Sequence, residues 1–211
     1  MIKNNDKRAR LKLYKLLFHR SLTTKIMKKV LKGLGIFLGV VVIAVVILNT
    51  VSSNEKEIII VSEQKIDAPA NVVYNKVRNF KNYPSWSPFR LTDPQQKFNI
   101  TAVDGQVGSQ FHWVGVAETS EGYQEIVGLE ENKAVKIKCN ITVPYEAKPE
   151  FNYYFTERDN NTYVRQEFKI KMDFPANIIA HLTDLRKEMR LMNEKGLSLL
   201  KKTCEEDLAK L

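Results

Sequence analysis

The sequence predicts an α+β protein: a seven-stranded curved antiparallel sheet wrapped around one long C-terminal helix, preceded by one N-terminal transmembrane helix. Three observations lead to this prediction. An uncharged apolar segment lies near the N-terminus, strand-like segments separated by turn residues fill the middle of the chain, and a long helical periodicity occupies its last part. Strands gathered in one part of the chain and a helix in another are typical of α+β domains.

The apolar segment predicts a membrane anchor at residues 33–53. No charged residue occurs from residue 33 to residue 54, and 33–48 (GLGIFLGVVVIAVVIL) is apolar throughout. Crossing the hydrocarbon core takes about 20 helical residues, whereas a buried core helix usually keeps a polar stripe. A cleaved signal sequence is the alternative. It is less favoured because its apolar core usually has about 7–15 residues and ends at an Ala-x-Ala-like site, which is missing here.

The positive charge is confined to residues 1–32. This arm holds eleven lysines and arginines against Asp6 alone, so it carries +10, and the remainder of the chain carries −1 of the net charge of +9. A nearly neutral domain lacks the basic footprint of a nucleic-acid-binding protein. We therefore expect no nucleic acid as a partner.

The same charge distribution predicts an orientation. Lysine and arginine collect on the cytoplasmic side of a span. We expect a single-pass protein of the plasma (inner) membrane, with a cytoplasmic N-terminus and a periplasmic or extracellular domain at 54–211. Met27 begins MKKVLKGLGIF, which is a complete basic-plus-apolar N-terminus in itself, so the true start is either Met1 or Met27.

The middle of the chain predicts seven strands joined by short turns. The turns are marked by segments that contain Gly, Asn or Asp, at 104–105, 121–122, 132 and 159–161. Their hairpin-sized spacing favours an antiparallel meander. The expected strands are 58–66, 97–103, 109–117, 123–130, 134–142, 150–157 and 162–172.

Two helical regions flank the later strands. Asp67-Ala68-Pro69 precedes apolar residues at helical spacing, which predicts a short helix to about Asn79, and the prolines of 83–88 (YPSWSP) break it. From Pro175 to about Glu206 the periodicity predicts one long helix. Its expected apolar face is Ile178, Leu182, Leu185, Met189, Met192, Gly196 and Leu199.

Several of these residues carry a resemblance. Residues 66–89 (IDAPANVVYNKVRNFKNYPSWSPF), Gly108, 111–113 (FHW) ahead of Gly115, and 196–202 (GLSLLKK) resemble the polyketide cyclase/dehydrase and lipid-transport family. That family belongs to the SRPBCC superfamily with the START-like helix-grip fold, and the resemblance covers residues 58–206. It implies a hydrophobic cavity between the long helix and the sheet that binds lipids, sterols or other apolar molecules. Its catalytic groups differ between subgroups, so none is carried over.

The candidate lining of this cavity is aromatic and methionine-rich. Aromatic rings supply large contact areas, and methionines adapt to variable ligands. Filling of an ordinary core is the alternative for each residue. The candidates are Trp86, Phe111, Trp113, Tyr153, Phe155, Met189 and Met192.

No catalytic set emerges from the remaining residue types. His19 lies in the basic arm, His112 alternates away from Phe111 and Trp113, and His181 lies beside the helix face. Single carboxylates lie on or directly beside predicted strands, at Glu118, Glu125 and Glu167, where a solvated face is the simpler interpretation.

Cys139 and Cys204 lack a disulfide-framework spacing, and no metal-ligand motif is found. We therefore predict no metal site, no cofactor and no catalytic residue. The function favoured is a membrane-anchored binding module for a hydrophobic small molecule or lipid. The alternatives are a cyclase, dehydratase or aromatase-type enzyme that uses the same cavity, and a structural or regulatory domain whose cavity has collapsed.

Overall fold

The computed structural model describes residues 3–116 and 119–210, with side chains described for 27–53, 56–116 and 119–210. It divides into two compact units, Met1–Val51 and Ser52–Leu211, which are described separately.

The first unit is a single helix, α1 (Lys3–Val51). Its section Met27–Val51 has 25 residues and a mean hydropathy of 2.8, so it is long and apolar enough to cross a membrane. A signal sequence near an N-terminus meets the same criterion. The helix continues through residue 33, so the predicted limit between arm and anchor is not a break in the backbone. Membrane orientation and identity stay predictions.

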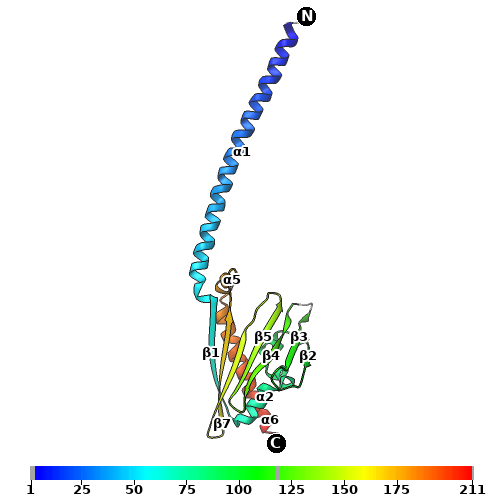
Figure 1. Ribbon diagram of the computed structural model, residues 1–211, viewed down its shortest axis with the longest axis vertical. Helices are drawn as coiled ribbons and strands as arrows, with labels where there is room; N and C mark the ends of the chain where they lie inside the picture. The colour runs from blue at the N-terminus through cyan, green and yellow to red at the C-terminus, as the bar shows by residue number, and fades with distance from the viewer. Residues whose placement is uncertain (1–2, 117–118, 211) are drawn as a thin grey trace. The chain divides into compact units, whose positions relative to one another are not determined.

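The second unit is built on one seven-stranded antiparallel sheet, as predicted (Figure 1). The strand order is β1-β7-β6-β5-β4-β3-β2, so strands β2 to β7 form a meander and β1 pairs with the last strand. The strands are β1 (Glu57–Ile66), β2 (Lys97–Thr101), β3 (Gln110–Val114), β4 (Glu121–Glu130), β5 (Ala134–Val143), β6 (Glu150–Arg158) and β7 (Asn161–Lys171).

The turn between β6 and β7 is confirmed and has a clear cause. Asp159 and Asn160 both have positive φ, 51° and 60°, and Arg158 pairs with Asn161 across the hairpin. Two successive left-handed residues make the tight turn that matches strand twist, and Asp and Asn tolerate that conformation best after glycine.

The predicted turn at Glu121-Gly122 is wrong. Both residues lie in β4, and the connection from β3 runs through residues 115–120, so β3 ends at Val114 instead of residue 117. Gly122 lies opposite Trp113. The indole covers the place where a side chain at residue 122 would lie, which makes glycine a strand residue here.

Short helices connect β1 to β2. The predicted first helix is α2 (Ala70–Arg78), and it is followed by η2 (Phe80–Asn82), α3 (Tyr83–Trp86) and α4 (Pro88–Thr92). A residue before a proline is usually pushed out of the helical region. Ser87 before Pro88 is extended, with ψ 124°, but Tyr83 before Pro84 is helical. The proline-rich segment therefore forms a series of short helical turns rather than a loop.

The predicted single C-terminal helix is wrong in one respect, because it consists of two helices. α5 (Ala176–Leu182) and α6 (Leu185–Leu208) are separated at Asp184, which has a left-handed backbone with φ 49°. Its carboxylate accepts a hydrogen bond from the Lys187 backbone N–H and caps α6. Leu182 is exposed, and the buried face of α6 consists of Asn193, Gly196, Leu197, Leu200 and Cys204.

Two apolar clusters stabilise the domain. The larger cluster joins α2 and the C-terminal half of α6 to the sheet around Phe80, Phe111 and Leu200, and the smaller joins β1 and β7 to α5 around Phe168. Ser52 in η1 (Ser52–Lys56) is buried beside α5, where Asn177 Nδ2 donates to its hydroxyl at 3.3 Å. The chain is thus fixed to the domain from its first residue after α1.

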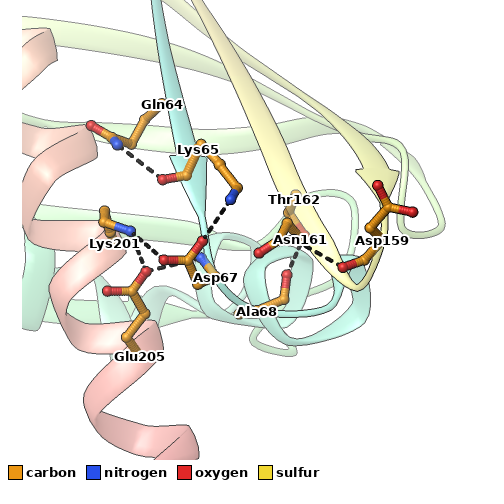
Figure 2. Close-up of polar contacts among 9 residues, drawn as sticks. All are labelled: Gln64, Lys65, Asp67, Ala68, Asp159, Asn161, Thr162, Lys201 and Glu205. Carbon is orange, nitrogen blue, oxygen red and sulfur yellow. Dashed lines mark hydrogen bonds and ion pairs between the residues drawn. The ribbon is translucent and has the colours of Figure 1, made fainter.

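A cluster of three charged residues, Asp67, Lys201 and Glu205, connects the C-terminal half of α6 to the end of β1 (Figure 2). Lys201 Nζ lies 3.1 Å from Asp67 and also pairs with Glu205, whose carboxylate accepts from the Asp67 backbone N–H at 2.9 Å. Hydrogen bonds from Lys201 and then Lys65 lower the pKa of Asp67. The hydrogen bond to Glu205 is the main cause of a raised Lys201 pKa.

Replacing Lys201 with methionine is expected to lower the Tm of the domain slightly at neutral pH. A lowered carboxyl pKa stabilises the fold above the unfolded pKa, near 4, and this contribution disappears as pH falls through the folded pKa. The Tm difference between wild type and Lys201→Met should therefore shrink at acid pH. Near-UV circular dichroism melts of the full chain in detergent measure it. Lys202→Met is the control, since Lys202 has only an exposed pair at 3.8 Å, and an equal effect of both variants would contradict the prediction.

Candidate ligand pocket

A small enclosed space lies inside the domain between α6 and the sheet. Its volume is about 10 Å³, which is enough for about one water molecule. The interior is therefore almost closed in this conformation. The lining residues are Tyr83, Trp86, Pro88, Phe89, Gln124, Phe151, Tyr153, Gln166, Met192, Asn193 and Gly196.

The helical wall is formed where α3 and α4 meet α6. Gly196 permits this approach, because a Cβ there would lie only 3.2 Å from Cδ of Pro88. Trp86, at the end of α3, is nearly fully buried and packs edge-on against Tyr83, with ring centroids 5.0 Å apart, and against Tyr153 at 6.0 Å. The indole of Trp86 therefore lies against the sheet, in contact with Tyr153 of β6.

The sheet wall places polar amides on an otherwise apolar face. Gln166 alternates on β7 with the buried Val164 and Phe168, and Gln124 precedes the buried Ile126 by two residues on β4. Successive residues of a strand face opposite sides, so both glutamines lie on the inner face. Each is about 95% buried.

A short hydrogen-bond chain connects part of this wall. Gln166 Nε2 donates to the Tyr153 hydroxyl oxygen at 3.2 Å and, at a longer 3.5 Å, to Asn193 Oδ1 on α6. Tyr153 is the cross-strand neighbour of Gln166, which brings the two side chains together.

Three buried donors around the space have no hydrogen-bond partner in the described part of the chain. They are Trp86 Nε1, Gln124 Nε2 and Asn193 Nδ2, on residues that are 2%, 5% and 3% exposed. Buried donors are nearly always paired in folded proteins, and leaving one unpaired costs about 1–3 kcal/mol. The space borders the larger apolar cluster, to which Trp86 and Tyr153 belong, and these three donors give that part of the interior a polar character.

The lining contains only neutral side chains. None of the described residues around the space is Asp, Glu, His, Lys or Arg. Burial raises the pKa of the Tyr83 and Tyr153 phenols, so both hydroxyl groups stay protonated at physiological pH. The pocket can donate and accept hydrogen bonds but holds no charge.

Three of the seven residues that the sequence suggested line the space: Trp86, Tyr153 and Met192. Phe111 lies deeper in the larger cluster, stacked on Phe98 with centroids 5.0 Å apart, and Phe155 packs edge-on against Tyr74. Trp113 donates to Ser120 Oγ at 3.0 Å, and Met189 packs against the smaller cluster. Their participation in ligand binding stays a prediction.

Sequence reasoning missed Gln124, Gln166 and Asn193. The signal was a polar residue at an inward position of a period-two strand, or one residue beyond the expected helix face. Asn193 is one of the buried residues of α6, so the buried face of this helix differs from the apolar face that the periodicity predicted.

The other residues considered for chemistry lie away from this space. His112 is half-buried and within 2.9 Å of Gln110 Oε1, while His181 is exposed. Glu125 accepts from Gln110 and Glu167 from Arg165, both on the outer face. His19 and Glu118 fall outside the described side chains.

Both cysteines are buried free thiols. Burial raises the pKa of each to about 12, so neither is a ready nucleophile. Within the described residues, no three His, Cys, Asp or Glu side chains come together in a way that would hold a metal ion.

Comparison with solved structures supports the fold. Protein CV1439 from Chromobacterium violaceum matches with a TM-score of 0.52 and 12% identity, covering 70% of this chain and 96% of its own. Norcoclaurine synthase from Thalictrum flavum matches with a TM-score of 0.53 and 13% identity, covering 71% and 87%. The protein TTHA0849 from Thermus thermophilus gives 0.50 and 16%, covering 71% and 98%.

No protein-family model matches the sequence, and no curated protein matches it significantly. At these identities the structural matches define the fold alone. The domain from Ser52 onward is a helix-grip domain: a seven-stranded antiparallel sheet with a long C-terminal helix on one face, preceded in the chain by one apolar helix.

Proposed function

We propose that this protein is a membrane-anchored binding module that holds a hydrophobic small molecule or lipid between α6 and the sheet. The main observation that supports this proposal is the composition of the residues that line the interior space. It is walled by aromatic rings, Met192, Pro88, Gly196 and buried amides, two of which have unpartnered donors. Apolar walls with a few polar groups are typical of ligand sites.

The helix-grip fold supports this proposal through the resemblance to the polyketide cyclase/dehydrase and lipid-transport family. The candidate span at Met27–Val51 supports it as well, because Ser52 follows the span directly and is already buried in the domain. A domain attached so closely to the span stays near the bilayer surface, where apolar molecules are concentrated.

The neutral lining favours binding over chemistry. A cyclase or dehydratase needs an acid or base within hydrogen-bond reach of its substrate. The described lining offers only phenols with raised pKa, amides and an indole.

The small volume favours a second candidate, a structural or regulatory domain with a collapsed cavity. A space of about 10 Å³ holds no organic molecule, so binding requires α3, α4 or α6 to move outward. The two candidates differ in whether the domain takes up a ligand.

Native mass spectrometry of the full chain in lipid nanodiscs distinguishes the candidates. The binding module should carry lipid or take up an added apolar probe such as methyl dodecanoate. Met192→Trp should fill the pocket and reduce occupancy at least about tenfold, since the larger ring occupies the space of the ligand. Leu191→Trp is the matched control, because Leu191 is 51% exposed on the same helix. An unliganded wild type at saturating probe favours the collapsed domain.

A further inference from the structure

The three unpartnered donors belong to residues of three separate elements that line one space. Trp86 comes from α3, Gln124 from β4 and Asn193 from α6, and all three side chains line the same space. A folded chain normally pairs such groups internally or with ordered water. Their common location indicates that the missing partner is a single acceptor group.

One water molecule does not satisfy this arrangement. The space holds about one water, and a water molecule would bring two O–H donors of its own into a site where three donors already lack an acceptor. The indole N–H is a donor only, so no reorientation of Trp86 removes the need for an acceptor. Asn193 is oriented by Gln166, whose Nε2 faces Asn193 Oδ1, and this directs Nδ2 away from that bond.

The neutral lining selects among acceptor groups. A carboxylate, sulfate or phosphate would bring a charge into a space whose described lining has no cationic side chain, and an uncompensated buried charge is very costly. An uncharged carbonyl oxygen has two lone pairs, accepts from two or more donors and carries no proton that needs an acceptor of its own. Phe89, Phe151 and Met192 supply apolar contacts for the rest of such a molecule.

We propose that the pocket recognises the uncharged carbonyl of an apolar ester or ketone, through hydrogen bonds from Trp86, Gln124 and Asn193. This inference rests on the proposed binding function and adds the chemistry of the ligand's polar group. It requires the pocket to enlarge around the apolar part of the ligand while the three donors stay directed at the carbonyl.

Three probes with hydrocarbon chains of similar length test this inference: methyl dodecanoate, tridecane and dodecanoate. Each is added to the full-length protein in nanodiscs. Native mass spectrometry counts bound probe in wild type, Gln124→Leu and Asn193→Leu. Each sample contains the same bilayer, so the ratio of variant to wild type removes the partition of probe into lipid. We expect methyl dodecanoate to bind best, and its preference over tridecane to fall on the order of tenfold in each variant.

A spectroscopic readout checks the indole directly. The chain has two tryptophans, so Trp113→Phe leaves Trp86 as the only one, and Trp113 does not line the pocket. Methyl dodecanoate should shift the emission of Trp86 to longer wavelength as its N–H gains an acceptor, and tridecane should not.

The possible outcomes separate the two proposals. Binding of tridecane equal to that of the ester, or tighter binding of dodecanoate, would overturn the carbonyl inference and leave the binding function intact. Binding of none of the three probes would overturn both. Unchanged ester preference in both leucine variants would also overturn the inference, because the donors would then have no part in recognition.

Discussion

Replacing Asn193 with leucine is expected to make the unliganded domain more stable. Asn193 is 3% exposed, its Nδ2 has no partner in the described chain, and its Oδ1 accepts only the long 3.5 Å bond from Gln166. Removing an unsatisfied buried amide and adding apolar surface should raise the free energy of unfolding by about 1–3 kcal/mol. For a domain of this size the Tm should rise by roughly 2–10 °C.

Gln166→Leu is the matched control for this experiment. Gln166 is equally buried in the same pocket, but its Nε2 donates to the Tyr153 hydroxyl. Its replacement leaves that hydroxyl and Asn193 Oδ1 without their donor, so the Tm should fall. Thermal melts of both variants in the same detergent make the comparison, and a lower Tm for Asn193→Leu than for wild type would contradict the prediction.

Opposite effects of these two substitutions would explain why a polar group is kept in this interior. Native proteins tolerate local destabilisation where function needs it. If Asn193→Leu both stabilises the fold and weakens the preference for a carbonyl probe, the cost of the unpaired amide is linked to ligand recognition.

Replacing Gly122 with alanine is expected to destabilise the domain strongly. A Cβ at residue 122 would clash with the Asn140 carbonyl oxygen of β5 and would lie 2.8 Å from Cζ2 of Trp113. Neither the backbone nor a packed indole yields easily. Such overpacking costs about 1–3 kcal/mol, which corresponds to a fall in Tm of roughly 2–10 °C.

Gly128→Ala on the same strand is the control. Its Cβ would meet only the flexible side chain of Lys136, at 3.4 Å, which is ordinary van der Waals contact. Its Tm should stay within about 2 °C of wild type, since surface substitutions usually change stability by less than about 0.5 kcal/mol. Equal losses in the two variants would show that glycine flexibility in β4, and not the packing of Trp113, sets the effect.

The sequence by itself determined the architecture of the domain. Alternating strands, Asp-Asn turns and a capped amphipathic helix are local features, and each is encoded by residues within a few positions of one another. The β6–β7 hairpin is the clearest case, because Asp159 and Asn160 adopt the left-handed conformations that their side chains favour. The apolar segment that predicts a membrane span is local in the same sense, because its length and composition suffice.

Contacts between residues far apart in the sequence decided the features that the local sequence pattern did not specify. Gly122 fits a turn by its local sequence, but Trp113 from the neighbouring strand covers it and makes it a strand residue. The break in the C-terminal helix is a local feature that the apolar periodicity did not predict, because Asp184 caps α6 through the Lys187 backbone N–H. The pocket depends most on contacts between distant residues. Trp86, Gln124 and Asn193 lie far apart in the chain, and only the packing of α3 and α6 on the sheet brings their unpartnered donors to one space, because hydrogen-bond satisfaction is a property of three-dimensional neighbours and not of sequence spacing.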